Sequence, residues 1–282
     1  SPLLISSMTG GTGRAQQINQ ALAEAARSAG IALGLGSLRA ALEDPALAPT
    51  YDVRRVAPNI LLFANLGAVQ LNYGYGLEQC QRAVDLVGAD ALILHFNALQ
   101  EAVQPEGDSR FSGLLARVEA VCRGLAVPVV AKEVGWGFSP QAARQLADAG
   151  VAAIDVAGSG GTSWSEVEYH RAPTAQHANV ARAFADWGIP TADSLRYVRE
   201  AAPGLPIFAS GGLRDGVDIA KCIALGAELG GMAGPFLKAA AQSVDAVSKL
   251  IWELSTQLRV AMFAAGAADI AALKQTPLYP VP

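Results

Sequence analysis

A histidine, two amides and a carboxylate follow one apolar run within a few residues of the sequence. The run Leu92-Ile93-Leu94 is typical of a strand buried on both faces, and it leads into His95, Asn97, Gln100 and Glu101. Side chains alternate along a strand, so we expect His95 and Asn97 on one side. Gln100 and Glu101 would reach the same space from the following loop. Burying such groups without partners is costly, so the cluster indicates a binding or catalytic site. The alternative is a strand end with a core histidine and a solvated loop.

Lys132 and two glycine-containing loops predict an anion site. Lys132 is in phase with Val130 in an apolar run, so the two share one face, and a buried lysine needs an anion. The loop Ser210-Gly211-Gly212-Leu213-Arg214 offers backbone N–H groups that can approach a phosphate, with Arg214 as a charged partner. Ala233-Gly234 follows the next apolar run. Together these residues predict phosphate binding.

The elements that must position these residues are short apolar runs separated by helical patterns. The runs are 3–7, 31–36, 60–65, 90–96, 128–134, 152–156, 206–210 and 228–232, and helices are expected over 14–29, 78–87, 140–149, 217–225 and 244–265. Eight strands alternating with helices predict an α/β fold, a TIM (β/α)8 barrel, as a single domain over residues 1–282. A doubly wound open sheet is the alternative. In the barrel, the polar and glycine residues follow the strands and fall on the ligand-binding rim.

Composition limits the class of protein. With 51% hydrophobic residues and a net charge of −4, the chain can bury a large core and does not suit a nucleic-acid or anionic membrane surface. Cys80, Cys122 and Cys222 are odd in number and widely spaced, which is typical of buried thiols in a reducing compartment. We find no signal-peptide pattern and no membrane-spanning run, and we expect a cytoplasmic protein. His170 and His177 are expected in an exposed loop.

Seven motifs, taken in order, resemble those of the FMN-dependent type 2 isopentenyl diphosphate isomerases. They are Met8-Thr9-Gly10-Gly11, Gly36-Ser37-Leu38-Arg39, Ala64-Asn65-Leu66-Gly67, His95-Phe96-Asn97-Ala98-Leu99-Gln100-Glu101, Lys132-Glu133-Val134-Gly135, Gly160-Gly161-Thr162-Ser163-Trp164 and Ser210-Gly211-Gly212-Leu213-Arg214. The resemblance covers nearly the whole chain. It implies an FMN-binding TIM barrel that interconverts isopentenyl and dimethylallyl diphosphate by a 1,3-proton transfer. It also implies FMN in its reduced form, Mg²⁺ with the substrate, and NADPH as the reductant.

The resemblance further implies roles for individual residues. The flavin and its ribityl chain would contact Met8, Thr9, Gly10, Ser37, Asn65, Lys132 and Thr162, and the flavin phosphate would contact Gly212, Arg214, Ala233 and Gly234. The substrate would face Arg39, His95, Asn97 and Gln100, the last three being the candidates for catalysis. Glu101 would hold the metal, because a carboxylate suits Mg²⁺ and Mg²⁺ suits a diphosphate on an acidic protein.

Family members carry a segment before the first strand that helps to hold the diphosphate. We expect this chain to lack that segment, and therefore to have an incomplete substrate site. The apolar outer helices and the low content of charged residues favour a homo-oligomer, a tetramer or larger.

Three other functions remain open at this point. An FMN-dependent 2-hydroxy-acid oxidase on the same barrel needs a base, typically histidine, and the loop Ser159-Gly160-Gly161-Thr162 offers none. A sugar-phosphate lyase could use Lys132 as a Schiff-base lysine. A flavin-storing barrel would leave the 95–101 cluster unexplained.

Overall fold

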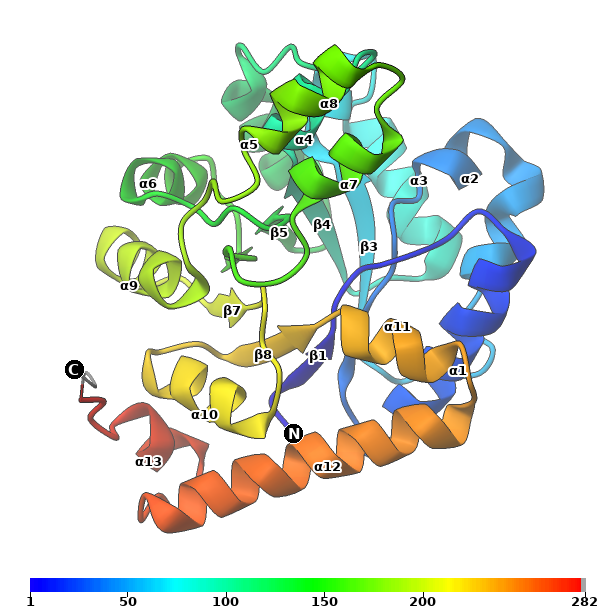
Figure 1. Ribbon diagram of the computed structural model, residues 1–282. Coiled ribbons are helices and arrows are strands. Elements are labelled where there is room, and N and C mark those ends of the chain that lie inside the picture. The colour runs from blue at the N-terminus through cyan, green and yellow to red at the C-terminus, as the bar shows by residue number, and fades with distance from the viewer. Residues whose placement is uncertain (280–282) are drawn as a thin grey trace.

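The strands of the computed structural model, which describes residues 1–279, form a closed parallel barrel in sequence order, β8 pairing with β1 (Figure 1). The strands are β1 (Leu3–Ile5), β2 (Ala32–Gly34), β3 (Leu62–Gly67), β4 (Ala91–Phe96), β5 (Val129–Glu133), β6 (Ala153–Asp155), β7 (Ile207–Ala209) and β8 (Leu229–Met232). The predicted TIM barrel is therefore confirmed, and the alternative open sheet is excluded. Most strands are shorter than the apolar runs from which they were predicted.

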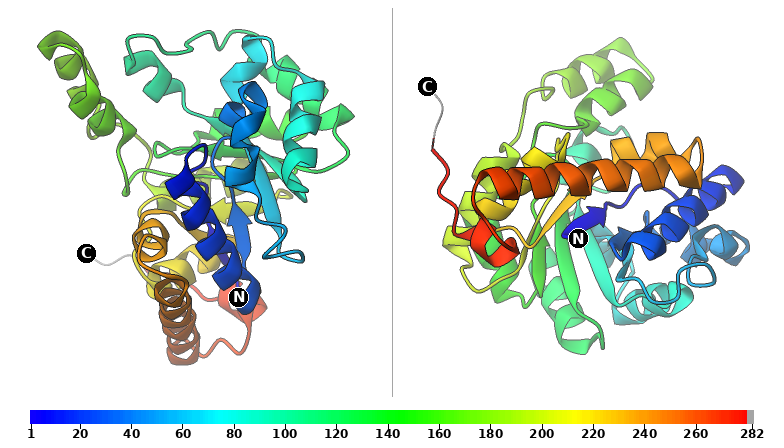
Figure 2. Two further views of the ribbon diagram at one scale, coloured as in Figure 1. Left: turned by 90° about the vertical axis from the view of Figure 1, so that its right-hand side faces the viewer. Right: turned by 90° about the horizontal axis from the view of Figure 1, so that it is seen from below.

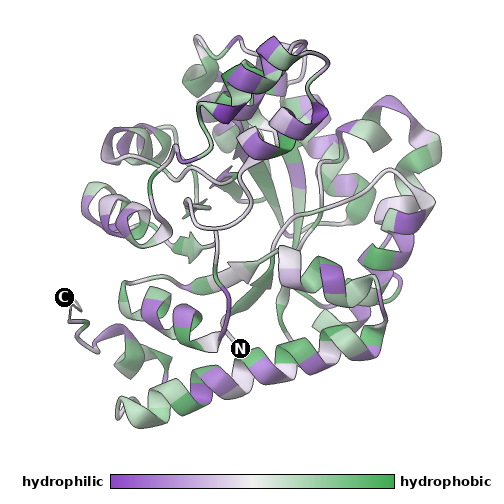
Figure 3. Cartoon of the chain, in the orientation of Figure 1, coloured by the Kyte–Doolittle hydropathy of each residue, from purple (hydrophilic) through white to green (hydrophobic). Residues whose placement is uncertain are grey.

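Helices follow the strands and cover the barrel from outside. They are α1 (Gly13–Ala29), α2 (Arg39–Glu43), α3 (Leu77–Val87), α4 (Ala98–Val103), α5 (Leu114–Gly124), α6 (Pro140–Asp148), α7 (Trp164–Arg171), α8 (Ala175–Arg182), α9 (Thr191–Ala201), α10 (Gly216–Ala224), α11 (Gly234–Ala240), α12 (Val244–Ala264) and α13 (Ile270–Lys274). Two 3-10 turns, η1 (Pro45–Tyr51) and η2 (Ala68–Asn72), complete the β2–β3 and β3–α3 connections. Most helices carry one polar and one apolar side, which suits an outer layer (Figure 3).

The helix ends follow from the residues found there. The Ser139 hydroxyl accepts a hydrogen bond from the Ala142 amide at the start of α6, and Pro140 takes the first helical position. Asp215 caps α10 in the same way. Gly30 ends α1 in a left-handed conformation, with φ +62°, that glycine adopts without strain.

The barrel interior begins as a layer of apolar side chains. Phe63 and Phe208 meet edge to face across it, with ring centroids 6.0 Å apart. The layer consists of Leu4, Ala32, Phe63, Ala91, Ile93, Val130, Ala153 and Phe208. Val130 belongs to this layer, so Lys132 faces the interior as predicted from its phase.

Two expectations about local structure were wrong. The segment that holds His170 and His177 is not a loop: it forms α7 and α8, which project beyond the barrel and pack on α4 (Figure 2). Both histidines are exposed, as expected. β4 ends at Phe96 and Asn97 is the N-cap residue of α4, so strand alternation does not apply to it. No helix within residues 1–279 combines the length and hydropathy needed to cross a membrane.

Candidate active site

A cavity of about 800 Å³ opens at the C-terminal ends of the strands, where ligands bind in this fold. The predicted residues that line it are Met8, Ser37, Asn65, His95, Gln100, Lys132, Thr162, Gly212, Arg214, Ala233 and Gly234. An adjoining pocket of about 430 Å³ is lined by Met8 and Ser37 together with the predicted residues Thr9, Gly10 and Arg39. Of the residues predicted from the sequence, Asn97 and Glu101 line neither pocket.

An ion pair lies under the cavity floor. Lys132 Nζ is 3.2 Å from Asp155 Oδ2, and it donates to Ser210 Oγ at 3.3 Å. The Ser210 hydroxyl in turn donates to Asp155 Oδ1 at 2.7 Å. Asp155 is fully buried and Lys132 nearly so. Register explains the contact, because Lys132 and Asp155 are paired positions on β5 and β6. The lysine that was predicted to need an anion thus has one inside the protein, and Lys132 is also among the residues that line the cavity.

His95 stands beside Lys132 in the same register, on β4. Burial, with the Lys132 charge as a second cause, lowers the pKa of His95 to about 4, so the ring is neutral near pH 7. Its Nδ1 is 2.7 Å from Asn65 Oδ1. A proton on Nδ1 satisfies that contact and leaves Nε2 as an acceptor. His95 is therefore suited to accept a hydrogen bond or a proton and does not supply positive charge.

Glu133 shapes the loop that continues the cavity wall. Its Oε2 accepts hydrogen bonds from the backbone N–H groups of Val134, Gly135 and Trp136, at 2.7, 2.9 and 2.6 Å. Burial raises the pKa of Glu133 to about 7, and the three amides oppose that rise. The side chain fixes the turn after β5 in which Val134 and Gly135 line the cavity.

The predicted phosphate loop 210–214 meets the glycine loop after β6 backbone to backbone. A Cβ on Gly212 would lie 2.3 Å from the Gly160 carbonyl carbon, and one on Gly161 would lie 2.8 Å from the Gly212 nitrogen. Gly212 also has φ +76°, a conformation that favours glycine. At Gly234, a Cβ would meet open space. Arg214 is 80% exposed and pairs with Asp218 at 3.0 Å, so the predicted phosphate partner lies at the edge of the site and already has an anion.

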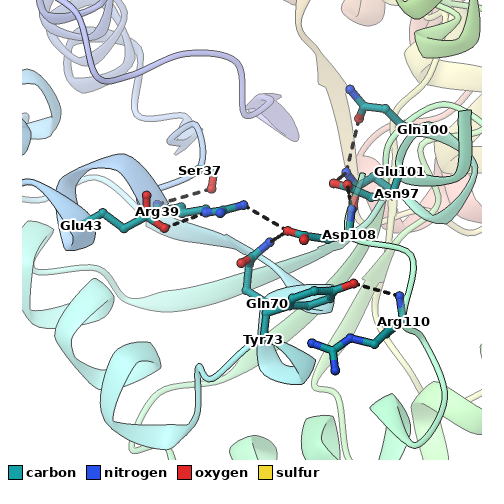
Figure 4. A network of polar contacts seen from close by, with 10 residues as sticks. All are labelled: Ser37, Arg39, Glu43, Gln70, Tyr73, Asn97, Gln100, Glu101, Asp108 and Arg110. Carbon is teal, nitrogen blue, oxygen red and sulfur yellow. Dashed lines mark hydrogen bonds and ion pairs between the residues drawn. The ribbon is translucent and has the colours of Figure 1, made fainter. Parts of the chain in front are cut away.

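A polar network joins Arg39 to Glu101 outside the main cavity (Figure 4). Arg39 Nη1 lies 3.2 Å from Asp108 Oδ2, and the Asp108 amide donates to Glu101 Oε2 at 2.7 Å. Asn97 Nδ2 donates to Glu101 Oε1 at 2.7 Å. Gly107 permits this approach, because a Cβ there would overlap the Glu101 carbonyl oxygen. Asn97 therefore orients Glu101, where strand alternation had placed it beside His95.

Gln100 points from α4 towards the cavity and is held by a carboxylate from α7. Its Nε2 donates to Glu168 Oε1 at 3.0 Å, and Gln104 donates to the same oxygen at 2.8 Å. Glu168 is buried. Donation through Nε2 fixes the amide orientation, and the Gln100 carbonyl oxygen accepts a long hydrogen bond from Asn97 Nδ2 at 3.4 Å, which leaves one lone pair for a bound group. The contact also docks the projecting α7 on α4.

Sequence reasoning missed Asp155, Glu168 and the roles of Ser210 and Glu133. Asp155 had a usable signal, since it lies two positions after the inward-facing Ala153 in an otherwise apolar strand. Glu168 had none, because its contact with Gln100 joins two elements far apart in the sequence.

The cavity fits a flavin nucleotide. Its wall brings together glycines from the segments that follow five strands, β2, β5, β6, β7 and β8, and Lys132 is among its lining residues. The Ser6 and Ser7 hydroxyls line the cavity and are buried without a hydrogen-bond partner, which indicates that a bound group satisfies them.

For a metal, no set of three or more His, Cys, Asp or Glu side chains that could ligate one occurs within residues 1–279. Mg²⁺ is commonly held by one or two carboxylates with substrate phosphates and water, so Glu101 alone is compatible with such a site.

These features define a flavin-binding (β/α)8 barrel, and similarity to known proteins places the chain in that class. The sequence profile described as "FMN-dependent dehydrogenase" matches residues 96–280. Among solved structures, a mandelate oxidase variant with a monooxide FMN adduct superposes with a TM-score of 0.67 at 22% identity, covering 97% of this chain and 78% of that one. At this identity the likeness extends to the fold alone.

Closer relatives give the particular family. A protein of a Synechocystis strain named isopentenyl-diphosphate delta-isomerase is 58% identical over 99% of this chain and 80% of its own length. A protein of the same name from Stutzerimonas stutzeri is 55% identical over 98% of this chain and 80% of its own length. The chain therefore belongs to the FMN-dependent, type 2 isopentenyl-diphosphate delta-isomerase family, a family of isomerases.

Proposed function

We propose that this protein interconverts isopentenyl and dimethylallyl diphosphate with FMN in the cavity and Mg²⁺ on the substrate. The observation that carries the proposal is the gathering of Asn65, His95, Gln100 and Lys132 in one cavity that ends in glycine backbone. A diphosphate ester with an apolar tail fits a cavity whose wall combines apolar side chains, among them Val134, Trp164 and Leu213, with polar loops.

When bound in reduced form, FMN supplies an acid–base centre without a net change of electrons. Lys132, fixed by Asp155, gives the floor of the flavin site a positive charge. The backbone N–H groups of Gly212, Ala233 and Gly234 would bind the flavin phosphate. Arg214 would add a positive charge at the edge of the site. The remaining flavin contacts predicted from the resemblance are Met8, Thr9, Gly10, Ser37, Asn65 and Thr162.

On the substrate side, Gln100 and His95 are the chain's own groups that reach the cavity. Gln100 is fixed by Glu168 and by Asn97, with one lone pair of its Oε1 left over, and neutral His95 presents an acceptor at Nε2. His95 can therefore accept a hydrogen bond or a proton from a bound group, and Gln100 can accept a hydrogen bond that orients such a group. Arg39, which lines the adjoining pocket, supplies a cation for the diphosphate.

Glu101 is the proposed metal ligand, and Asn97 and the Asp108 amide hold its carboxylate in place. NADPH as reductant remains a prediction from the resemblance, and a homo-oligomer and a cytoplasmic location remain predictions from the sequence.

The metal assignment is tested by Glu101→Gln, which keeps the shape of the side chain and removes its charge. We expect most of the Mg²⁺-dependent turnover of isopentenyl diphosphate to be lost while FMN affinity is retained, measured anaerobically with reduced FMN over a Mg²⁺ titration. Glu106→Gln, at an exposed glutamate of the same segment, is the control and should behave as the unchanged protein. Full activity of Glu101→Gln with an unchanged Mg²⁺ dependence would assign Glu101 to the loop structure alone.

A further inference from the structure

Three large apolar side chains lie in a row on the outward face of α12. Phe263, Trp252 and Val260 are 89%, 66% and 61% exposed. The opposite side of the helix is buried against α1, α10 and α11 through Val247, Ile251, Leu254 and Leu258. The view from below shows α12 running across the outside of the barrel (Figure 2). Isolated exposed apolar residues are ordinary, whereas a contiguous set marks an interaction surface.

The charged and apolar positions of this face are arranged symmetrically about Thr256. Trp252 precedes Thr256 by one helical turn and Val260 follows it by one turn. Glu253 and Arg259 stand at equal distances on either side of the same residue, with opposite charge. Arg259 Nη2 donates to the Thr256 hydroxyl at 3.2 Å, so its guanidinium already lies over the centre of the face.

We propose that α12 packs antiparallel against α12 of a second copy of this chain, about a two-fold axis through Thr256. In this register Trp252 of one copy lies against Val260 of the other, and Glu253 comes within reach of Arg259 of the other. Each contact occurs twice, as an isologous interface requires. The proposal specifies the surface used by the homo-oligomer named under Proposed function, and rests on that part of it.

Charge complementarity selects a second copy as the occupant. In the antiparallel register, Glu253 meets Arg259 and Lys249 comes level with the exposed Phe263 ring, a favourable cation–aromatic placement. A parallel register would set Glu253 against Glu253 and Arg259 against Arg259. The face is therefore complementary to itself in one orientation.

A charge exchange tests the pairing. Arg259→Glu places a glutamate opposite Glu253 of the other copy at both of these contacts. It should raise the dissociation constant for self-association about tenfold or more, measured by sedimentation. The double variant Glu253→Arg/Arg259→Glu restores opposite charges and should return to the value of the unchanged protein. Arg196→Glu, at an exposed arginine on α9, is the matched control and should have no effect. A monomeric protein at all concentrations, or self-association that none of the α12 variants alters, would overturn the proposal.

A disulfide tests the register. Residue 256 lies on the proposed axis, so two cysteines introduced by Thr256→Cys face one another at a separation that a disulfide spans. Lys249→Cys cysteines would be separated by about 21 Å along the axis and should not link. The native thiols, Cys80, Cys122 and Cys222, are replaced by Ala or Ser in both proteins so that only the new cysteines react. Rapid linkage at 256 and none at 249 is expected, and the reverse would contradict the register.

FMN binding by the same α12 variants distinguishes the proposed α12 pairing from the proposed function. α12 lines neither pocket, so variants that become monomeric should retain FMN absorbance and FMN affinity. Loss of pairing with FMN retained supports the α12 surface. Normal pairing in a protein that binds no FMN would leave the α12 surface intact and refute the flavin site.

Discussion

Two successive layers of the barrel interior differ in chemistry although the same strands build them. The lower layer holds Leu4, Phe63, Ile93, Val130, Ala153 and Phe208; two positions further along the same strands stand Ser6, Asn65, His95, Lys132, Asp155 and Ser210. Both sets point inward, since strand side chains repeat with a period of two. The lower layer closes the barrel with apolar packing. The upper layer is therefore free to carry hydrogen bonds and charge directly under the ligand cavity.

Substitutions in the two layers should therefore have different effects on stability and on FMN binding. A substitution in the lower layer removes apolar contacts and should cost stability in proportion to the volume lost. A substitution in the upper layer leaves a buried polar partner unsatisfied and alters the floor of the flavin site. Substitutions in the lower layer should therefore reduce the free energy of unfolding without changing FMN affinity, whereas substitutions in the upper layer should change FMN affinity as well.

The largest effect is expected for Lys132→Met, which leaves the fully buried Asp155 without its cation. Breaking a buried pair costs about 3–5 kcal/mol, so both the free energy of unfolding and FMN affinity should fall, measured by urea unfolding and flavin titration. Ile93→Val in the lower layer should cost about 0.5–1.5 kcal/mol and leave FMN affinity unchanged. Lys132→Met/Asp155→Leu should recover stability without recovering FMN. Equal losses of unfolding free energy and of FMN affinity in Lys132→Met and Ile93→Val would contradict the difference between the layers.

The free energy of unfolding should depend on pH through His95 in the upper layer, whereas the apolar side chains of the lower layer do not titrate. Its pKa is about 4 in the folded protein, below the ordinary value of 6.5, so the unfolded chain takes up a proton first as pH falls. The stability that depends on neutral His95 is complete above pH 6.5 and is lost between pH 6.5 and 4, by at most about 3 kcal/mol. His95→Asn should flatten this part of the profile in urea unfolding, whereas the exposed His177→Asn should not. An unchanged slope in His95→Asn would contradict the account.

Gly212→Ala tests the glycine contact at the rim. The added Cβ would lie 2.3 Å from Gly160 backbone, so the two loops must separate, and FMN affinity should fall about tenfold or more in a flavin titration. Gly30→Ala is the control, since Gly30 has a similar positive φ but no atom within 4 Å of the added group. It should cost about 1–2 kcal/mol of stability and leave FMN affinity unchanged. Equal FMN affinities in the two variants would show that the rim does not hold the flavin.

The smallest effect is expected for Arg214→Ala. Arg214 is exposed and already paired with Asp218, so solvent screens its charge and the loss of FMN affinity should be small. Raising the salt concentration should shrink it further in the same titration. No change at low salt would remove Arg214 from the phosphate site.

Much of the barrel could be predicted because its signals are local. The apolar runs predicted all eight strands, and the phase of Lys132 with Val130 placed the lysine inside. Prediction failed where tertiary contacts decide. Asn97 lies one residue beyond the end of β4, so alternation misplaced it. Glu168 meets Gln100 across distant elements, which no spacing reveals.

The upper layer is proposed to hold a flavin that serves isomerisation without consuming electrons. The direct measurement is an anaerobic reaction in which the protein's FMN is reduced once, excess reductant is removed, and dimethylallyl diphosphate formed from isopentenyl diphosphate is counted against the reduced flavin that remains. We predict many product molecules for each FMN, with the absorbance of the reduced flavin unchanged. Product that never exceeds the FMN present, with reoxidation of the flavin in step with product, would contradict the account.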